Sequence, residues 1–255
     1  MSKLASPDKF IDLSDYGRFP ATLFARQFKD TQLTPIHVTL LFGIAGLLAI
    51  CCILKGHYWA ASVFIILKSI LDAADGELSR VKNTPSYTGR YLDSIFDIIL
   101  NFAFLMTICY VSNASFLLML LAFIGMQLQG TLYNYYYVIL RNKSIGGDAT
   151  SQIFEDTSPK AFPSESQKAV DILFTIFYVL YSVFDKIIHF LDREAYKVTT
   201  FPNWFMTLVS IYGLGFQLLI IAVMLPLNLI VYIIPFFIVY SVFIFIFIGI
   251  RKVLF

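Results

Sequence analysis

Long apolar stretches recur along this chain and constrain its fold more than any other feature. A helix needs about 20 mostly apolar residues to cross a bilayer. Six stretches fit: Pro35–Leu54, His57–Ile70 continuing to Arg80, Arg90–Val111, Ala114–Leu140, Trp204–Leu225 and Leu227–Ile250. Apolar residues make up 58% of the 255 residues and charged residues 14%, against about 45–50% apolar in a soluble domain. We therefore expect an all-α, polytopic integral membrane protein with six transmembrane helices.

The basic residues predict the orientation of these helices, because lysine and arginine near the ends of spans favour the cytoplasm. With the N-terminus inside, six crossings keep every basic cluster inside and leave Lys55 outside. A further crossing by Ile172–Leu191 would move Arg193, Lys197 and the terminal Arg251 and Lys252 outside. We therefore expect residues 172–191 to form an interfacial or re-entrant helix, and the turn between the second and third spans to face the cytoplasm.

The chain before the first span differs from the rest in composition. Between residues 7 and 30, apolar positions recur among charges at roughly helical spacing, which indicates an amphipathic helix on the membrane surface. A helix that binds a partner protein is the alternative. We expect two regions, an N-terminal cytoplasmic amphipathic segment (1–34) and a membrane domain (35–255). The net charge of +2 gives no basic field for nucleic acid.

Four aspartates lie where the second and third spans approach the cytoplasm. Asp72 and Asp75 are three residues apart, and Asp93 and Asp97 are four apart. Both spacings place a pair on one helical face. The polar segment 81–88 between the spans lets the two helices form a hairpin, so that the two faces converge.

Four carboxylates in one small volume repel one another unless a cation neutralises them. Ligands that are all oxygen favour a hard ion such as Mg²⁺, Mn²⁺ or Ca²⁺. A bound ion in turn favours a substrate that carries phosphate, above all the diphosphate of a nucleotide. Gly76 and Gly89, which have no side chains, allow close approach of a ligand to the backbone. The pattern therefore predicts a metal-dependent phosphate site.

The same stretch resembles the signature of the CDP-alcohol phosphotransferase family, D-x2-D-G-x2-A-R-x8-G-x3-D-x3-D. The spacing fits at every position, and the one departure is a serine where the family has alanine. The matching residues are Asp72, Asp75, Gly76, Ser79 (in place of alanine), Arg80, Gly89, Asp93 and Asp97. A weaker echo of the family's P-N-x-x-T pattern is present as Pro35 and Thr39, with Ile36 in place of asparagine.

The resemblance implies a site with two divalent ions, Mg²⁺ or Mn²⁺. Asp72, Asp75 and Asp93 would hold metal and the diphosphate of a CDP-linked substrate, and Asp97 would bind the second ion and act as general base. Cytidine and phosphate would lie against Gly76, Ser79, Arg80 and Gly89. The resemblance also implies a homodimer in the membrane lipid, with a CDP-linked lipid or alcohol and an acceptor alcohol as substrates.

Two versions of this transfer remain open. In the first, CDP-diacylglycerol donates a phosphatidyl group to a small polar alcohol and CMP is released. In the second, a CDP-linked choline or ethanolamine donates to diacylglycerol. The compact chain and its DSIFD sequence, where the second type tends to read DHGCD, favour the first. An ion-coupled transporter is the alternative from another class, because intramembrane carboxylates can carry ions.

Further polar residues lie near the motif. Lys68 precedes Asp72 by one turn and is interpreted as a counter-ion. The tyrosines 133 and 135–137 at the end of the fourth span are typical of an aromatic belt at the membrane surface, with an acceptor pocket as the alternative. Arg141 is a candidate for contact with an anionic head group.

Overall fold

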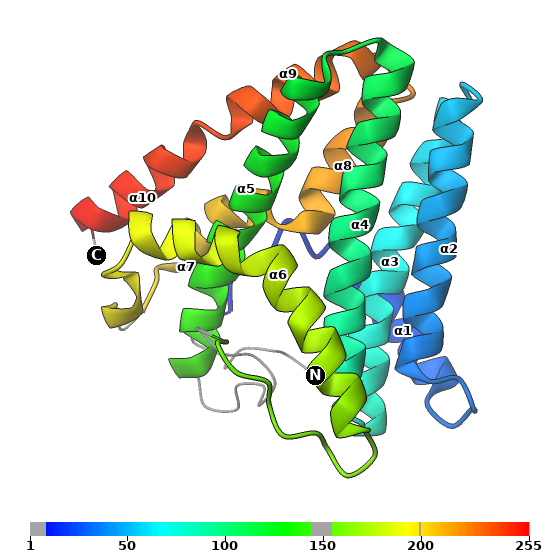
Figure 1. Ribbon diagram of the computed structural model, residues 1–255, viewed down its shortest axis with the longest axis vertical. Helices are drawn as coiled ribbons and strands as arrows, with labels where there is room; N and C mark the ends of the chain where they lie inside the picture. The colour runs from blue at the N-terminus through cyan, green and yellow to red at the C-terminus, as the bar shows by residue number, and fades with distance from the viewer. Residues whose placement is uncertain (1–8, 144–154, 199, 255) are drawn as a thin grey trace.

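The computed structural model describes residues 9–143, 155–198 and 200–254, and all the regular structure in these ranges is helical (Figure 1). The elements, in order, are α1 (Arg18–Phe28), α2 (Pro35–Leu54), α3 (Tyr58–Lys82), α4 (Tyr87–Ser112), α5 (Phe116–Lys143), α6 (Gln167–Leu191), η2 (Ala195–Lys197), α7 (Asn203–Val209), η3 (Ser210–Tyr212), α8 (Leu214–Met224), α9 (Ile230–Tyr240) and α10 (Phe243–Leu254). The all-helical fold class is confirmed.

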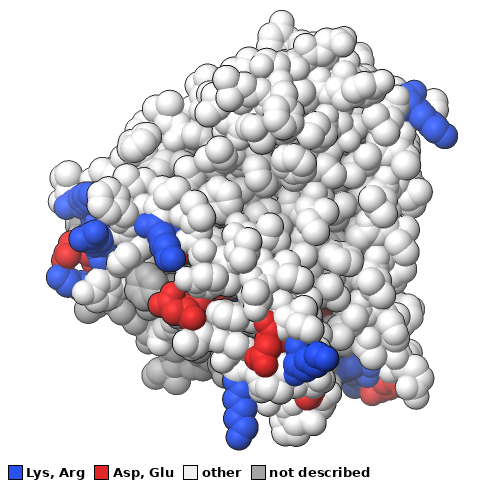
Figure 2. All heavy atoms as spheres, in the orientation of Figure 1, with Lys and Arg blue, Asp and Glu red and all other residues white. Residues whose placement is uncertain are grey.

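Within the described ranges, five helical segments are long and apolar enough to cross a membrane: α2, α4, α5, α6 and α9–α10. The pair α7 to α8 makes a sixth if it counts as one bent span. Charged side chains gather along the lower edge and lower left of the molecule, and the rest of the face in Figure 2 is almost free of charge. The apolar surface is therefore suited to lipid, as expected of an integral membrane protein.

Helices α2, α3 and α4 run side by side (Figure 1). Two glycines of α2 allow it to pack closely on α4, since a Cβ at Gly46 would lie 2.7 Å from the Leu100 side chain and one at Gly43 would lie 3.0 Å from Phe96. A capping box between Thr34 and His37 begins α2. Helix α3 carries too many charges to count as a span by composition, but it runs alongside α2 and ends at the charged edge.

The N-terminal helix, expected within residues 7–30, is shorter in the structure: α1 begins at Arg18 and ends at Phe28. Residues 9–17, which we call the N-terminal strap, are not helical; Asp12 accepts hydrogen bonds from the backbone N–H and the hydroxyl of Ser14 and turns the chain. Helix α1 buries Ala21 and Ala25 in a small cluster with α3 and leaves Phe19 and Leu23 exposed on its other side. This exposed apolar face fits the predicted contact with the membrane surface.

The predicted span Trp204–Leu225 is not one straight helix, because α7 to η3 and α8 meet at a bend of 53°. At this bend the Ser210 hydroxyl accepts a hydrogen bond from the N–H of Leu13 in the strap (2.9 Å). The span predicted at Leu227–Ile250 is interrupted between α9 and α10. Gln129 of α5 donates to the Phe237 carbonyl (3.2 Å) and to the Ser241 hydroxyl (2.9 Å) there. At both breaks, polar groups from elsewhere in the chain form hydrogen bonds, as irregular backbone in a membrane requires.

Helix α6 is oblique to α4 and α5 (Figure 1). It follows directly on Glu165, which binds the start of α4, and at its other end the Leu191 carbonyl accepts a hydrogen bond from Lys252 near the end of α10 (2.9 Å). Most of its surface is exposed and apolar. By length and composition α6 qualifies as a span, so its expected interfacial or re-entrant position stays a prediction.

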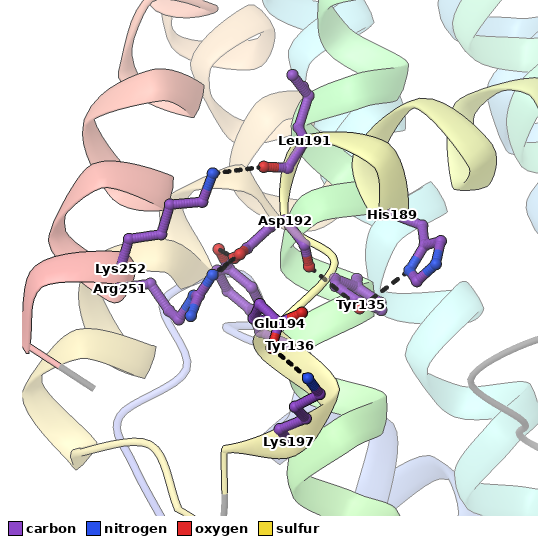
Figure 3. Close-up of polar contacts among 9 residues, drawn as sticks. All are labelled: Tyr135, Tyr136, His189, Leu191, Asp192, Glu194, Lys197, Arg251 and Lys252. Carbon is purple, nitrogen blue, oxygen red and sulfur yellow. Dashed lines mark hydrogen bonds and ion pairs between the residues drawn. The ribbon is translucent and has the colours of Figure 1, made fainter.

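A buried polar cluster joins the end of α6 to α5 and α10 (Figure 3). The fully buried Asp192 forms an ion pair with Arg251 of α10 and accepts a hydrogen bond from its Nε (2.8 Å). The Tyr136 hydroxyl of α5 donates to the same carboxylate (2.6 Å). An ion pair this deep holds three helices together only while both charges are present.

Glu165 caps the first turn of α4, the helix that carries Asp93 and Asp97. Its carboxylate accepts hydrogen bonds from the Ser86 hydroxyl (2.7 Å) and from the N–H groups of Thr88 (2.7 Å) and Tyr87 (3.1 Å). Partial burial acts to raise the pKa of Glu165, but these hydrogen bonds outweigh it and hold the pKa below its ordinary value.

We expect Asp192→Asn to destabilise the protein by about 3–5 kcal/mol, because it leaves Arg251 as an unpaired buried charge. Thermal unfolding in detergent checks this. The matched control is Glu194→Gln, which removes an exposed pair with Lys197 and should cost at most about 1 kcal/mol. Equal melting temperatures for the two variants would contradict a supporting role for the buried pair.

We expect the stability contributed by Glu165 to depend on pH. Because its pKa is lowered in the folded state, the contribution is complete above the unfolded pKa of about 4.3 and is lost as the pH falls through the lower folded pKa. Wild type should therefore melt above Glu165→Gln at about pH 7, and the gap should shrink once the pH falls below the folded pKa of Glu165. Asp30→Asn at an exposed position is the control, and a gap that persists in acid would refute the capping role.

Candidate active site

The hairpin of α3 and α4 carries all four aspartates of the motif. Asn83 ends α3 in the left-handed conformation (φ 53°), which few residues other than glycine and asparagine adopt. Three residues later, the Ser86 side chain caps α4 by accepting from the N–H of Gly89 (2.8 Å). This tight connection places the last turns of α3 beside the first turns of α4, as the sequence predicts.

Three of the four aspartates form a group that could hold a metal ion. One carboxylate oxygen each from Asp72, Asp75 and Asp93 lies within 4.8 Å of the others. One oxygen of Asp93 is buried and has no hydrogen-bond partner among the described residues. Thr39, the residue of the weaker echo, donates its hydroxyl to Asp75 (2.7 Å). An orphaned carboxylate oxygen among like charges fits a hard divalent cation.

Asp97 lies outside this group and has a different partner, Lys68. The ammonium of Lys68 contacts Asp97 and lies 2.9 Å from a carboxylate oxygen of Asp72. Lys68 is fully buried, and its Nζ lies 4.7 Å from the centre of the Phe42 ring. The geometry agrees with the counter-ion interpretation and shows that Lys68 serves two carboxylates, one on each helix.

The aspartates open into a cavity of about 830 Å³ between α3, α4, α5 and α8. All four residues expected at the nucleotide line it: Gly76, Ser79, Arg80 and Gly89. Arg80 forms an ion pair with Glu77 (2.9 Å), while its Nε has no partner among the residues described. Ser79 donates to the Thr84 carbonyl (2.8 Å) and so stabilises the hairpin.

One face of α5 forms the opposite wall of the cavity. Gln127, Thr131, Asn134 and Arg141 follow one another at helical spacing, and all line it. The tyrosines of α5 divide between two sides: Tyr133 and Tyr137 line the cavity, whereas Tyr135 and Tyr136 contact residues of the Asp192 cluster. Tyr133 and Tyr137 thus line a pocket, whereas Tyr135 and Tyr136 are buried inside the fold and do not form the expected aromatic belt.

Two sets of contacts at the edge of the cavity have no counterpart in the sequence pattern. The N-terminal strap borders the cavity with Asp12, whose carboxylate accepts from the Tyr133 hydroxyl (2.5 Å). From the other side, Glu155 forms two hydrogen bonds with Arg90 (2.7 and 2.6 Å) and accepts from the Tyr91 hydroxyl (2.7 Å). Residues 64 to 121 positions apart make these contacts, so no local pattern signals them.

Comparison with known proteins agrees with this geometry. A search of curated proteins finds no match to the chain. The model of the CDP-alcohol phosphatidyltransferase family matches residues 32–249, a range that begins just before α2, includes the whole aspartate hairpin and ends within α10. Since the match covers most of the chain and the four aspartates lie together as the family's signature implies, the protein belongs to the CDP-alcohol phosphatidyltransferase family.

Proposed function

We propose that this phosphotransferase moves a phosphatidyl group from CDP-diacylglycerol to the hydroxyl of a small polar alcohol and releases CMP. The observation that carries the proposal is the position of Asp97. It lines the same cavity as Asp72, Asp75 and Asp93, and it precedes the buried Asn101 by one turn of α4.

The three carboxylates of Asp72, Asp75 and Asp93 would bind the CDP-linked donor through a metal ion. Asp72, Asp75 and Asp93 suit Mg²⁺ or Mn²⁺, and an ion bound there would attract the diphosphate of the donor and offset charge on the transferred and leaving oxygens. Gly76, Ser79, Arg80 and Gly89 would line the cytidine and phosphate pocket. Their place along one wall of the cavity supports this role.

Asp97 would act as the general base. It takes the proton from the acceptor hydroxyl as that oxygen attacks the β-phosphorus, and the bond from this phosphorus to the bridging oxygen breaks. CMP leaves with the bridging oxygen, and the acceptor is joined to the phosphatidyl group. A hydroxyl is a poor nucleophile at neutral pH, so a positioned carboxylate assists it.

The polar residues next to Asp97 favour a polar acceptor over diacylglycerol. Asn101 follows Asp97 by one turn of α4 and is 4% exposed, and its side-chain oxygen has no partner among the described residues. Gln127 and Thr131 of α5, 7% and 8% exposed, line the same cavity. Buried amide and hydroxyl groups are costly unless they are hydrogen-bonded, and an acceptor rich in hydroxyl groups would satisfy them.

The site would face the cytoplasm. The hairpin that carries the aspartates ends in Arg80, Lys82 and Arg90, whereas the turn between α2 and α3 at the other end carries only Lys55. This distribution follows the bias of basic residues towards the cytoplasm. A homodimer, which the resemblance implies, remains a prediction.

We expect Asp97→Asn to lower the rate of CMP release by about 10²–10⁴-fold, the usual effect of losing a general base. The assay uses purified protein, CDP-diacylglycerol, Mg²⁺ or Mn²⁺ and a panel of acceptor alcohols, with identification of the lipid product. Asp30→Asn, at an exposed site, is the matched control. Normal CMP release by Asp97→Asn, or no release by wild type with any acceptor, would refute the proposed function.

We expect Asn101→Leu to raise the KM for the acceptor about tenfold or more, equivalent to about 1.4 kcal/mol, with little change in the KM for the donor. The reason is that the substitution removes only the amide that faces the acceptor. Thr107→Val is the matched control, since Thr107 is a buried polar residue of α4 whose hydroxyl bonds the Ala103 carbonyl of its own helix. Equal effects on both KM values would argue against a separate acceptor site.

A further inference from the structure

Lys68 occupies an unusual place in a site built to bind cations. It is fully buried in α3, and its ammonium lies between a carboxylate of its own helix, Asp72, and one of the neighbouring helix, Asp97. The face of the Phe42 ring lies nearby, at 4.7 Å. This cation–π contact and the two carboxylates both stabilise the ammonium of Lys68 in its buried position.

The carboxylates of the motif therefore fall into two sets with different counter-charges. Asp75 and Asp93 come together with Asp72 in the group that could hold an ion. Asp97 is the aspartate of the motif outside that group, and it contacts the ammonium instead. Asp72 belongs to both sets, because it also lies 2.9 Å from Lys68.

A divalent ion that used the same oxygens of Asp72 and Asp97 as Lys68 would have to displace the ammonium. Two cations at hydrogen-bonding distance from the same carboxylates would repel strongly in a buried site, where the effective dielectric constant is low. Lys68 has little freedom to withdraw, since its side chain is enclosed by α2, α3 and α4. One oxygen of Asp97 is thus already paired with a positive charge that the chain itself provides.

We propose that Lys68 replaces the second metal ion in this protein, so that the site holds one divalent ion per chain, at Asp72, Asp75 and Asp93. The ammonium then orients Asp97 towards the acceptor and links the two helices through Asp72. This inference rests on the proposed function for the role of Asp97 but concerns the number of ions, which is measured separately.

The test is a titration of the purified full-length protein in detergent with Mn²⁺ alone, with bound ions counted by electron paramagnetic resonance. Wild type should bind one Mn²⁺ per chain and show the spectrum of an isolated ion, without the exchange coupling of two ions about 3.5–4 Å apart. Asp75→Asn should weaken this binding at least tenfold. Two ions per chain in wild type, with the second lost in Asp97→Asn, would overturn the proposal.

The variant Lys68→Met has an unbranched side chain that is one atom shorter and carries no charge. We expect it to bind a second Mn²⁺ and to show exchange coupling, and Lys68→Met/Asp97→Asn to return to one ion. A single ion in Lys68→Met, at a melting temperature close to that of wild type, would also overturn the proposal. If Lys68→Met does not fold, the wild-type count and the Asp97→Asn variant still decide.

The same preparations separate this inference from the proposed function. Release of CMP with two bound Mn²⁺ per chain would leave the enzyme reaction intact and refute the role of Lys68. One bound Mn²⁺ without any CMP release from CDP-diacylglycerol would support Lys68 and refute the proposed donor.

Discussion

The repulsion among four carboxylates at the ends of two membrane helices is the constraint around which this structure is organised. The spacing of the motif brings them together, and each surrounding feature reduces the cost of doing so. Thr39 of α2 donates to Asp75, and Lys68 binds Asp72 and Asp97. Both contacts need α2, α3 and α4 to pack closely, which Gly43 and Gly46 allow. The close packing of these helices is therefore needed for the neutralisation of the carboxylate charges.

The second half of the chain solves a different problem, which is to leave a polar cavity open beside the hairpin. Straight apolar helices would fill that space with side chains. The bend between η3 and α8 instead accommodates the N-terminal strap, through the bond from Leu13 to Ser210. The break after α9 is stabilised by Gln129. Since free backbone groups in a membrane are costly, these breaks persist because polar side chains from α5 and from the strap complete their hydrogen bonds.

The sequence predicts those parts of the fold and site that depend on local spacing. The positions of α2 to α5 and the meeting of Asp72, Asp75 and Asp93 follow from apolar length and helical period, and the structure confirms them. Contacts between distant segments have no such signal. The strap, which was expected to be helical, is held by Tyr133 at a separation of 121 residues, and Glu155 reaches Arg90 across 65. The breaks after η3 and α9 were missed for the same reason.

The two walls of the cavity come from different parts of the chain, and this separation bears on how the reaction could acquire its acceptor. The hairpin of α3 and α4 supplies every residue of the motif. Helix α5 and the N-terminal strap supply the facing side chains, among them Asn134, Arg141 and Asp12. Asp97 and Asn101, one turn apart on α4, line the cavity as well. Under the proposed function, a change on α5 would alter the alcohol that fits without disturbing the aspartates, whereas a change at Asn101 would act one helical turn from the proposed base, Asp97. On this proposal, the choice of acceptor and the chemistry are physically separable except along that turn of α4.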